Sequence, residues 1–138
     1  LIHGQWPNEL KLIENKLEKN ITISGEKMVK VSKNGKDSIT EFRIIEKSKF
    51  FTKISCNLIT GRTHQIRVHT SSNNFPIVGD SKYGNKEKDK KFLENDLKRM
   101  FLHSSHLEIK DLNLKVSCEE PKEFKKIIKI SESKSFLT

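Results

Sequence analysis

A ten-residue stretch in the middle of the chain holds the densest group of side chains that could do chemistry. Residues 60–69 read Thr-Gly-Arg-Thr-His-Gln-Ile-Arg-Val-His, and Arg62 and Arg67 are two of only four arginines among 27 basic residues. A guanidinium can bind one carboxylate or phosphate through two parallel N–H groups, which a lysine ammonium cannot do. Arginine in a chain whose usual cation is lysine therefore indicates that an anion must be held in a fixed direction.

Several other kinds of site find little support. His103 and His106 are three residues apart on an expected strand, where their side chains would point to opposite faces. His64 and His69 are five apart, whereas a helical zinc pair is four apart. The sequence also contains no nucleophile elbow and no phosphate-binding glycine loop. We therefore expect neither a metal site nor a hydrolase triad.

Asp80 lies in a glycine-flanked segment, Gly-Asp-Ser-Lys-Tyr-Gly, at residues 79–84. An aspartate in such a setting commonly accepts hydrogen bonds from the backbone of its own turn. A catalytic carboxylate is the alternative, and we favour the turn. Arg62, together with the free N–H groups of a helix that begins near Thr63, could bind a phosphate.

Antiparallel strands are expected to deliver the chain to this stretch. Residues 27–32 alternate apolar and polar side chains, and residues 38–46 and 49–59 are typical of two further paired strands. Asn34-Gly35 predicts a hairpin turn, because both residues tolerate positive φ. The preceding segment, residues 5–26, should be extended, with short strand pairing.

Helices are expected after the polar stretch and at the end of the chain. Thr63 could cap a helix over residues 63–72 that ends at Asn73-Asn74, with Ile66 and His69 facing inward. The charged region 85–99 suggests a second helix, from Leu93 and Leu97. Downstream we expect a short buried strand at 77–78, strands at 100–109 and 114–118, and a helix that begins at Pro121, with an apolar face formed by Phe124, Ile127, Ile128 and Ile130. The fold class is α+β, a mostly antiparallel or mixed sheet with packed helices.

Composition bounds the function only coarsely. The 138 residues make one domain or part of one, and the first four, Leu-Ile-His-Gly, look like the tail of a strand that was cut. A net charge of +9 suits a polyanion such as nucleic acid, although many lysines can simply be solvated. Two distant cysteines are typical of reduced thiols in the cytoplasm, and no apolar run reaches bilayer length.

Four segments taken together resemble the C-terminal half of the RluA-type RNA pseudouridine synthases. They are residues 61–69, 76–80 (Pro-Ile-Val-Gly-Asp), 83–84 (Tyr-Gly) and 101–103 (Phe-Leu-His). Upstream residues at 17–20, 24–27, 31–32 and 35–36 are similar to members of the family that act on large-subunit ribosomal RNA.

The resemblance implies an isomerase that converts selected uridines of 23S ribosomal RNA to pseudouridine. The C1′–N1 bond breaks, the uracil rotates, and C5 joins C1′, with the target base flipped out of the RNA. It also implies a monomeric enzyme that uses no metal or organic cofactor, acts in the cytoplasm and does not bind membranes.

The resemblance also assigns roles to individual residues. Arg67 matches the arginine that forms an ion pair with the catalytic aspartate and keeps it ionised. Leu102 matches the apolar side chain beside the flipped base, and Ile66 is a second candidate for that wall. Arg62 and His64 match motif positions near the pocket, where contact with RNA phosphate and local support are expected.

The catalytic motif itself, an Arg-Leu-Asp run, is absent, and so is the tyrosine that stacks on the base. None of the five aspartates, Asp37, Asp80, Asp89, Asp96 and Asp111, sits in such a motif. Asn73-Asn74-Phe75 replaces the usual Gly-His before the proline. We therefore expect residues 1–138 to be the C-terminal portion of the catalytic domain, with the catalytic aspartate and any S4-like domain upstream.

This interpretation predicts that the chain alone is inactive and that it exposes strand edges and apolar surface. One alternative is a non-catalytic, basic RNA-binding module that retains the synthase fold. Another is a structural or protein-interaction domain, which would not bind RNA even at low salt.

Overall fold

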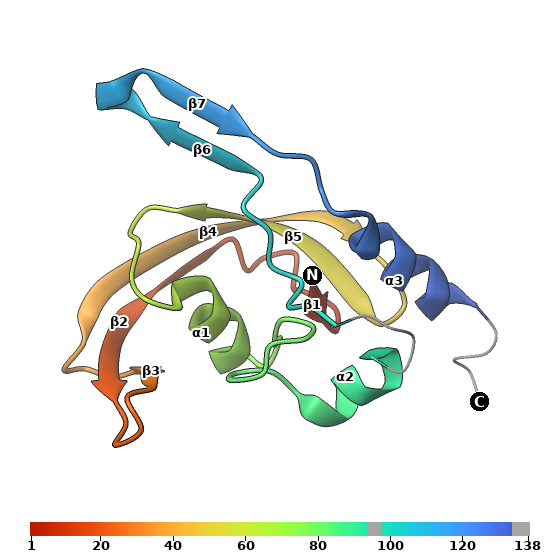
Figure 1. Ribbon diagram of the computed structural model, residues 1–138, viewed down its shortest axis with the longest axis horizontal. Helices are drawn as coiled ribbons and strands as arrows, with labels where there is room; N and C mark the ends of the chain where they lie inside the picture. The colour runs from red at the N-terminus through yellow and green to blue at the C-terminus, as the bar shows by residue number, and fades with distance from the viewer. Residues whose placement is uncertain (94–97, 134–138) are drawn as a thin grey trace.

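The computed structural model describes residues 1–93 and 98–133. These residues form a five-stranded antiparallel sheet, a separate two-stranded hairpin and three α-helices (Figure 1). The expected α+β class is confirmed. In chain order the elements are β1 (Ile2–His3), β2 (Leu12–Ile21), β3 (Lys27–Val31), β4 (Lys36–Lys47), β5 (Phe51–Leu58), α1 (Gln65–Ser72), α2 (Lys86–Leu93), β6 (His106–Ile109), the 3₁₀ turn η1 (Lys110–Leu112), β7 (Leu114–Ser117) and α3 (Lys122–Glu132).

The sheet has the order β1-β5-β4-β2-β3, so β3 and β4 flank the same strand. Leu17 of β2 is aligned with Val31 on one side and with Lys36 on the other. Residues 32–35 must therefore cross β2 between the two pairings. A Cβ atom at Gly35 would overlap the backbone carbonyl of Leu17, so only glycine permits this close approach.

The predicted hairpin at Asn34-Gly35 is therefore wrong. Neither residue has a positive φ, and the two strands that they connect do not pair with each other. Both strands pair with β2 instead, which gives each of them a long partner within the extended segment 5–26. The glycine is required for backbone proximity, which a dipeptide pattern does not distinguish from a turn.

The hairpin of β4 and β5 was predicted correctly, and it brings the chain to the polar stretch. The two strands pair from Thr40↔Leu58 to Lys47↔Thr52, with an irregularity between Ile44 and Glu46. In Figure 1 the strands arch over α1, which starts directly below the end of β5. Val68 of α1 packs with Leu17 and Val29 from the sheet.

The remaining core lies on both sides of the short strand β1. On one side Trp6 packs against Phe42 of β4, with ring centroids 4.7 Å apart. On the other side α2 and α3 close over the sheet edge. The buried residues of this second cluster are Leu1, Phe51, Val78, Phe92, Phe101, Phe124, Ile127 and Ile128. The predicted apolar face of the last helix is thus confirmed, and Pro121 is its N-cap.

The other downstream predictions are only partly confirmed. Residues 77–78 are buried, but their ladder pairing is a single bridge, Ile2↔Ile77. The expected strand at 100–109 exists only as β6, because Phe101 instead lies in the core, where its N–H donates to the carbonyl of Val78. A helix does form within 85–99, whereas Leu97 lies outside the described residues. None of the described helices has both the length and the apolar character that crossing a bilayer requires.

The crossing at Gly35 can be tested with one methyl group. Gly35→Ala should lower the free energy of unfolding by about 1–3 kcal/mol, because the added Cβ must displace the backbone of Leu17. Gly61→Ala is the matched control, since a Cβ there would meet no atom within 4 Å. Urea unfolding followed by circular dichroism measures both variants. Equal stability of the two would contradict the proposed role of Gly35.

Candidate active site

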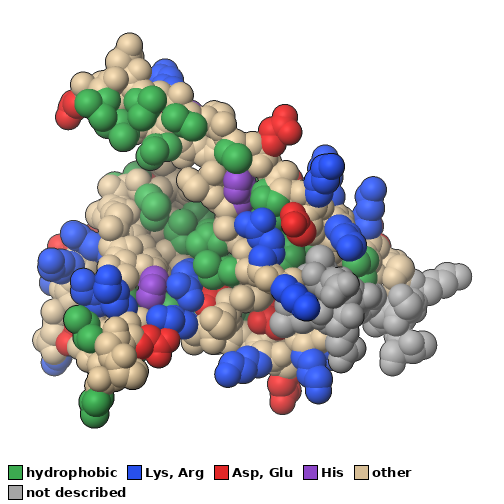
Figure 2. All heavy atoms as spheres, viewed as in Figure 1, with side chains coloured by type: hydrophobic (Ala, Val, Ile, Leu, Met, Phe, Trp, Pro, Cys, Tyr) green, Lys and Arg blue, Asp and Glu red, His purple; other side chains and the backbone are tan. Residues whose placement is uncertain are grey.

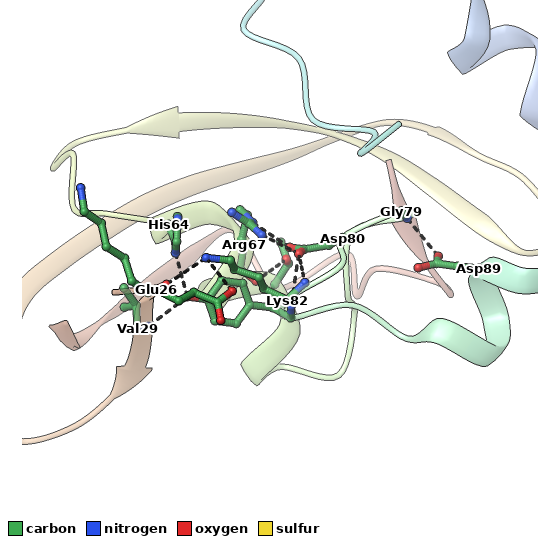
Figure 3. Close-up of polar contacts among 11 residues, drawn as sticks. Glu26, Val29, His64, Arg67, Gly79, Asp80, Lys82 and Asp89 are labelled. Atoms are coloured by element: carbon green, nitrogen blue, oxygen red, sulfur yellow. Dashed lines mark hydrogen bonds and ion pairs between the residues drawn. The ribbon is translucent and has the colours of Figure 1, made fainter. Parts of the chain in front are cut away.

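The centre of the polar region is an ion pair between Arg67 of α1 and Asp80 of the following loop. Arg67 donates from Nε to Oδ2 at 2.8 Å and from Nη2 to Oδ1 at 2.7 Å (Figure 3). The Asp80 side chain is 1% exposed and that of Arg67 is 14% exposed. The pair is therefore bidentate and almost fully shielded, which is the geometry that a guanidinium provides and an ammonium does not.

The loop is folded so that the Asp80 carboxylate accepts hydrogen bonds from backbone N–H groups of the same loop as well as from Arg67. Oδ1 accepts the N–H groups of Lys82 and Tyr83 at 3.0 and 3.1 Å, so the predicted turn-stabilising role is confirmed. Gly79 has φ +77°, and a Cβ on Gly84 would overlap the Asp80 carbonyl. The two glycines thus allow the tight loop that presents the carboxylate to α1.

The environment keeps both partners of the pair charged. Burial alone would raise the pKa of Asp80, but hydrogen bonds from Arg67 and from two backbone N–H groups outweigh it and leave that pKa below its ordinary value. The hydrogen bond to Asp80 raises the pKa of Arg67 against the opposing effect of burial. The ion pair therefore persists through the neutral range.

One edge of the Arg67 guanidinium remains available. Asp80 occupies Nε and one N–H of Nη2, and no other hydrogen bond to this guanidinium comes from the described residues. The Tyr83 ring lies against it, with the guanidinium carbon 5.0 Å from the ring centroid. A guanidinium has five N–H groups, so the edge formed by Nη1 and Nη2 can donate hydrogen bonds to a second carboxylate or a phosphate.

Tyr83 connects this loop to the sheet and to His64. Its hydroxyl oxygen accepts the N–H of Val29 at 2.9 Å and lies 2.8 Å from His64 Nδ1. Burial, with the nearby positive charge of Arg67, lowers the pKa of His64. The Tyr83 hydroxyl donates a hydrogen bond to the unprotonated Nδ1 of a neutral His64, so these two side chains form a hydrogen-bonded support beside the ion pair.

Lys82 makes a second connection between the loop and the sheet. Its ammonium lies 3.0 Å from a carboxylate oxygen of Glu26 and donates to the carbonyl of Lys27 at 3.1 Å (Figure 3). Glu26 and Lys27 belong to the turn and the start of β3. The loop that carries Asp80 is therefore tied to the β2–β3 hairpin at two points, Lys82 and Tyr83.

Gln65, and not Thr63, organises the start of α1. The side-chain Oε1 of Gln65 accepts from the Thr60 hydroxyl at 2.7 Å and from the Arg62 backbone N–H at 2.9 Å. Its side-chain Nε2 donates to the backbone carbonyl of Ile39 on β4. The N-cap position is His64, which adopts a left-handed conformation with φ 54° and makes no side-chain cap. The prediction that Thr63 caps the helix is therefore wrong.

His69 faces inward as predicted, but its neighbours are polar. It is fully buried, with Nδ1 2.8 Å from the Thr40 hydroxyl and Nε2 2.8 Å from Asn15 Oδ1. Burial lowers its pKa to about 4, so the ring is neutral. A neutral ring that accepts at Nδ1 and donates at Nε2 satisfies both contacts, and this network fixes α1 on β2 and β4.

The other predicted site residues fall into two groups. Ile66 and Leu102 are both half-buried and pack against the same apolar cluster around Trp6 and Ile77. Arg62 is exposed, and its Nε donates to the Asp37 carbonyl at 2.8 Å. The structure thus brings Arg67 and His64 together with Asp80 and Tyr83, which were not predicted as site residues. The motif Gly-Asp-Ser-Lys-Tyr-Gly was the available signal for both.

Comparison with known proteins matches this chain to RNA pseudouridine synthases. Residues 5–72 match the family model described as RNA pseudouridylate synthase. Ribosomal large subunit pseudouridine synthase C of Salmonella typhi is 38% identical over 141 residues, which cover 98% of this chain and 44% of that protein. The protein of the same name from Escherichia coli (strain K12) is 45% identical over 109 residues, which cover 78% of this chain and 34% of that protein. The resemblance found in the sequence, including the similarity to this type of synthase, is confirmed.

A solved structure supports the fold independently. Human RNA Pseudouridylate Synthase Domain Containing 1 superposes with a TM-score of 0.69 at 25% identity, covering 87% of this chain and 52% of that chain. The chain therefore spans less than half the length of the curated relatives and about half of this human protein.

The ion pair predicts a specific dependence of stability on pH. Asp80→Asn should lower the free energy of unfolding by about 3 kcal/mol at pH 7, because it leaves a shielded guanidinium without its counter-charge. Folding lowers the pKa of Asp80. The stabilisation that the ionised Asp80 gives to the folded state is therefore complete above about pH 4, and it is lost as the pH falls through the folded-state pKa. The difference in the free energy of unfolding between wild type and Asp80→Asn should therefore be smaller in acid than at pH 7.

Asp37→Asn is the matched control for this measurement. Its side chain is 77% exposed and lies 3.9 Å from Lys16, so the same chemical change should alter stability by less than about 0.5 kcal/mol. Urea unfolding of both variants at pH 7 and pH 3 tests the pair. An effect of Asp80→Asn that is small or independent of pH would contradict the assigned role.

Proposed function

The chain belongs to the RNA pseudouridylate synthase family, and from this premise we propose that it forms part of an enzyme that converts uridine to pseudouridine in 23S ribosomal RNA. The names of the relatives, ribosomal large subunit pseudouridine synthase C, support this choice of RNA. The observation that carries the proposal is the Arg67–Asp80 pair. It directs one edge of a guanidinium at the protein and leaves the other edge for a further anion.

The proposed reaction is an isomerisation without net oxidation. The N1–C1′ bond of the uridine breaks, the uracil rotates, and a C5–C1′ bond forms, while the hydrogen on C5 leaves as a proton and N1 gains one. A catalytic carboxylate must remain ionised beside the substrate for this chemistry. Arg67 would stabilise that carboxylate in the charged form and fix its direction through two N–H bonds.

Within this proposal Asp80 is a positioning residue. It holds the Nε side of Arg67, so that the free Nη1–Nη2 edge points in one direction before the second carboxylate arrives. Preorganisation of this kind avoids the cost of reorienting a charged group during the reaction. A lysine could not hold two carboxylates in fixed relative directions, because its ammonium has no planar fork.

The apolar and basic residues would complete the substrate site. Leu102 and Ile66, which pack on one cluster, would form the wall beside the flipped base. Arg62 uses only its Nε within the described residues, so its outer N–H groups can bind an RNA phosphate. His64 is neutral, which suits local support of the loop through Tyr83 better than binding of an anion.

We propose that residues 1–138 are the C-terminal portion of the catalytic domain and are inactive alone. The catalytic aspartate would come from the part of the synthase domain that the relatives contain beyond the matched region. The whole enzyme would be a monomer that uses no cofactor and acts on ribosomal RNA in the cytoplasm.

A non-catalytic RNA-binding module is the second candidate, favoured by the net charge of +9. Both candidates require that the protein binds RNA. The logarithm of the binding constant should then fall linearly with the logarithm of the salt concentration. They differ in chemistry, so release of tritium from 5-tritiated uridine RNA separates them. A chain that binds no RNA even at low salt would contradict both candidates and favour a protein-interaction domain.

A chimera provides the test of catalysis. In it, residues 1–138 replace the matched part of the Salmonella typhi relative, which supplies the remaining synthase domain. The chimera should release tritium, and the isolated chain should release none. Arg67→Ala in the chimera should lower the rate by about 1,000-fold, because it removes the charged partner of the catalytic carboxylate.

Two controls make this result specific. Arg43→Ala removes an exposed arginine from β4 and should leave the rate within about 2-fold of the unaltered chimera. Arg67→Lys keeps the charge without the fork and should recover little activity. Full activity of Arg67→Ala, or clear turnover by the isolated chain, would overturn the proposal.

A further inference from the structure

Two buried side chains that the proposed reaction does not use, His3 of β1 and Asp89 of α2, meet next to the loop that carries Asp80. His3 Nε2 lies 2.7 Å from Asp89 Oδ1, and the two side chains are 2% and 6% exposed. The same oxygen accepts the backbone N–H of Gly79 at 3.0 Å (Figure 3). One carboxylate oxygen therefore joins β1 and α2 to the residue directly before Asp80.

Asp89 lies on the buried face of a helix whose other charged residues face solvent. The four lysines of α2 and Glu87 are exposed, whereas Asp89 and Phe92 are buried. Residues three apart share a helix face, so the buried side of α2 presents a carboxylate beside an aromatic ring. A carboxylate in such a place is unfavourable unless it accepts hydrogen bonds, and the two donors to Oδ1 meet this need.

Aromatic rings surround the His3 side chain. Its ring centroid lies 5.5 Å from that of Phe51 and 6.1 Å from that of Phe92. Burial lowers the pKa of His3 against the opposing effect of its hydrogen bond to Asp89, so the ring is neutral at pH 7. A neutral ring with its proton on Nε2 donates to Asp89, and the apolar surroundings make this hydrogen bond stronger than it would be in water. His3 thus fixes the direction of the Asp89 carboxylate. Hydrophobic side chains also gather on the visible face of the molecule between the hairpin of β6 and β7 and the rest of the protein (Figure 2).

The backbone around Gly79 needs an external contact to hold its conformation. The N–H groups of Val78 and Asp80 bond to backbone carbonyls, whereas that of Gly79 bonds to the Asp89 side chain. Gly79 has φ +77°, and glycine adopts positive and negative φ about equally readily. The residue itself therefore does not determine which conformation it takes. The hydrogen bond from Gly79 to Asp89 fixes the direction in which the chain enters Asp80.

We propose that Asp89 is a positioning residue of the active site, which through the Gly79 N–H sets the direction of the Asp80 carboxylate and hence of the Arg67 guanidinium. A displacement of Asp80 would be transmitted directly, because two hydrogen bonds of 2.8 and 2.7 Å hold the guanidinium to this carboxylate. The consequence for catalysis rests on the proposed function, whereas the consequence for the Arg67 side chain does not. Misplacement of a catalytic group by about 1 Å can lower a rate on the order of 100-fold.

A purely structural role is the competing explanation, in which the His3–Asp89 pair only anchors α2. The helix already has an apolar anchor, because the Phe92 ring packs against Phe51 with centroids 4.6 Å apart. Anchoring alone would also leave the hydrogen bond from Gly79 to Asp89 without a purpose. The two explanations differ in what they predict for the Arg67 side chain when the protein remains folded.

Matched substitutions separate the two explanations. Asp89→Leu removes the acceptor of both N–H groups, whereas Asp89→Asn retains a carbonyl oxygen that can accept from Gly79. Glu87→Leu is the control, because it removes an exposed carboxylate from the same first turn of α2. His3→Leu combined with Asp89→Leu makes the whole buried pair apolar, which avoids an unpaired His3 and still leaves Gly79 without its acceptor. Circular dichroism at the assay temperature confirms that each variant is folded.

Nuclear magnetic resonance of the chain labelled with ¹⁵N-arginine measures the positioning without catalysis. Exchange of the Arg67 Nε–H with water should become about 10-fold faster in Asp89→Leu and in the double variant, and should change by less than about 3-fold in Asp89→Asn and Glu87→Leu. The backbone N–H of Arg43, in the middle of β4, reports the stability of the sheet in the same sample. Exchange at Arg67 in the double variant that is no faster than in wild type, or faster only in proportion to Arg43, would overturn the proposal.

Tritium release by the chimera measures the consequence for catalysis. Asp89→Leu and the double variant should lower kcat roughly 30-fold and leave the KM for RNA within about 2-fold, because the proposed RNA contacts are untouched. Asp89→Asn should restore kcat to within about 3-fold, and Glu87→Leu should not alter it. Faster exchange at Arg67 together with an unaltered chimera that releases no tritium would contradict the proposed function alone. Unchanged exchange and unchanged kcat in an active chimera would contradict the positioning role alone.

Discussion

The structure depends on the ion pair between Arg67 and Asp80, which joins α1 to the loop after it. Both charges are shielded, and Arg67 donates two hydrogen bonds to the Asp80 carboxylate. The cost of taking such charges out of water is recovered only when the geometry is good and the remaining oxygen and nitrogen atoms are also bonded. The turn N–H groups of Lys82 and Tyr83 meet that condition on the carboxylate side.

Much of the surrounding structure can be understood as support for this pair. The sheet reaches α1 through Gln65 and His69, whose polar contacts with β4 fix the helix in rotation as well as in position. Tyr83 and Lys82 fix the loop against the β2–β3 hairpin from the other side. Arg67 is therefore held at its backbone and at one edge of its side chain, and no group among residues 1–93 and 98–133 hydrogen-bonds to its other edge.

The sequence predicted local features well and long-range contacts poorly. The turn at Asp80 and the helix after Thr60 follow from neighbouring residues, and both are present. The Arg67–Asp80 pair was missed, because two residues thirteen apart meet only if the loop between them folds back. The family pattern also directed attention to an aspartate outside the chain. The proposed catalytic aspartate would be compatible with Asp80, since one guanidinium can donate to two carboxylates.

Two further errors have physical causes of the same kind. Asn34-Gly35 has the composition of a turn, but the glycine is needed where the chain crosses β2 at Leu17. The residues of β6 and β7 alternate like strands of a central sheet, yet they pair only with each other within the described structure. Periodicity indicates which face of a strand is apolar, whereas the partner of that face depends on polypeptide far away in sequence.

The central claim is that Arg67 holds Asp80 and a second carboxylate at the same time. Nuclear magnetic resonance of the chimera labelled with ¹⁵N-arginine tests it directly, using the isolated chain as reference. We predict that the Nε–H signal of Arg67 is protected from exchange in both samples and disappears in Asp80→Asn, while its Nη signals shift and become protected only in the chimera. Loss of the protected Nε–H signal in the chimera would contradict the account, because it would mean that the second carboxylate replaces Asp80.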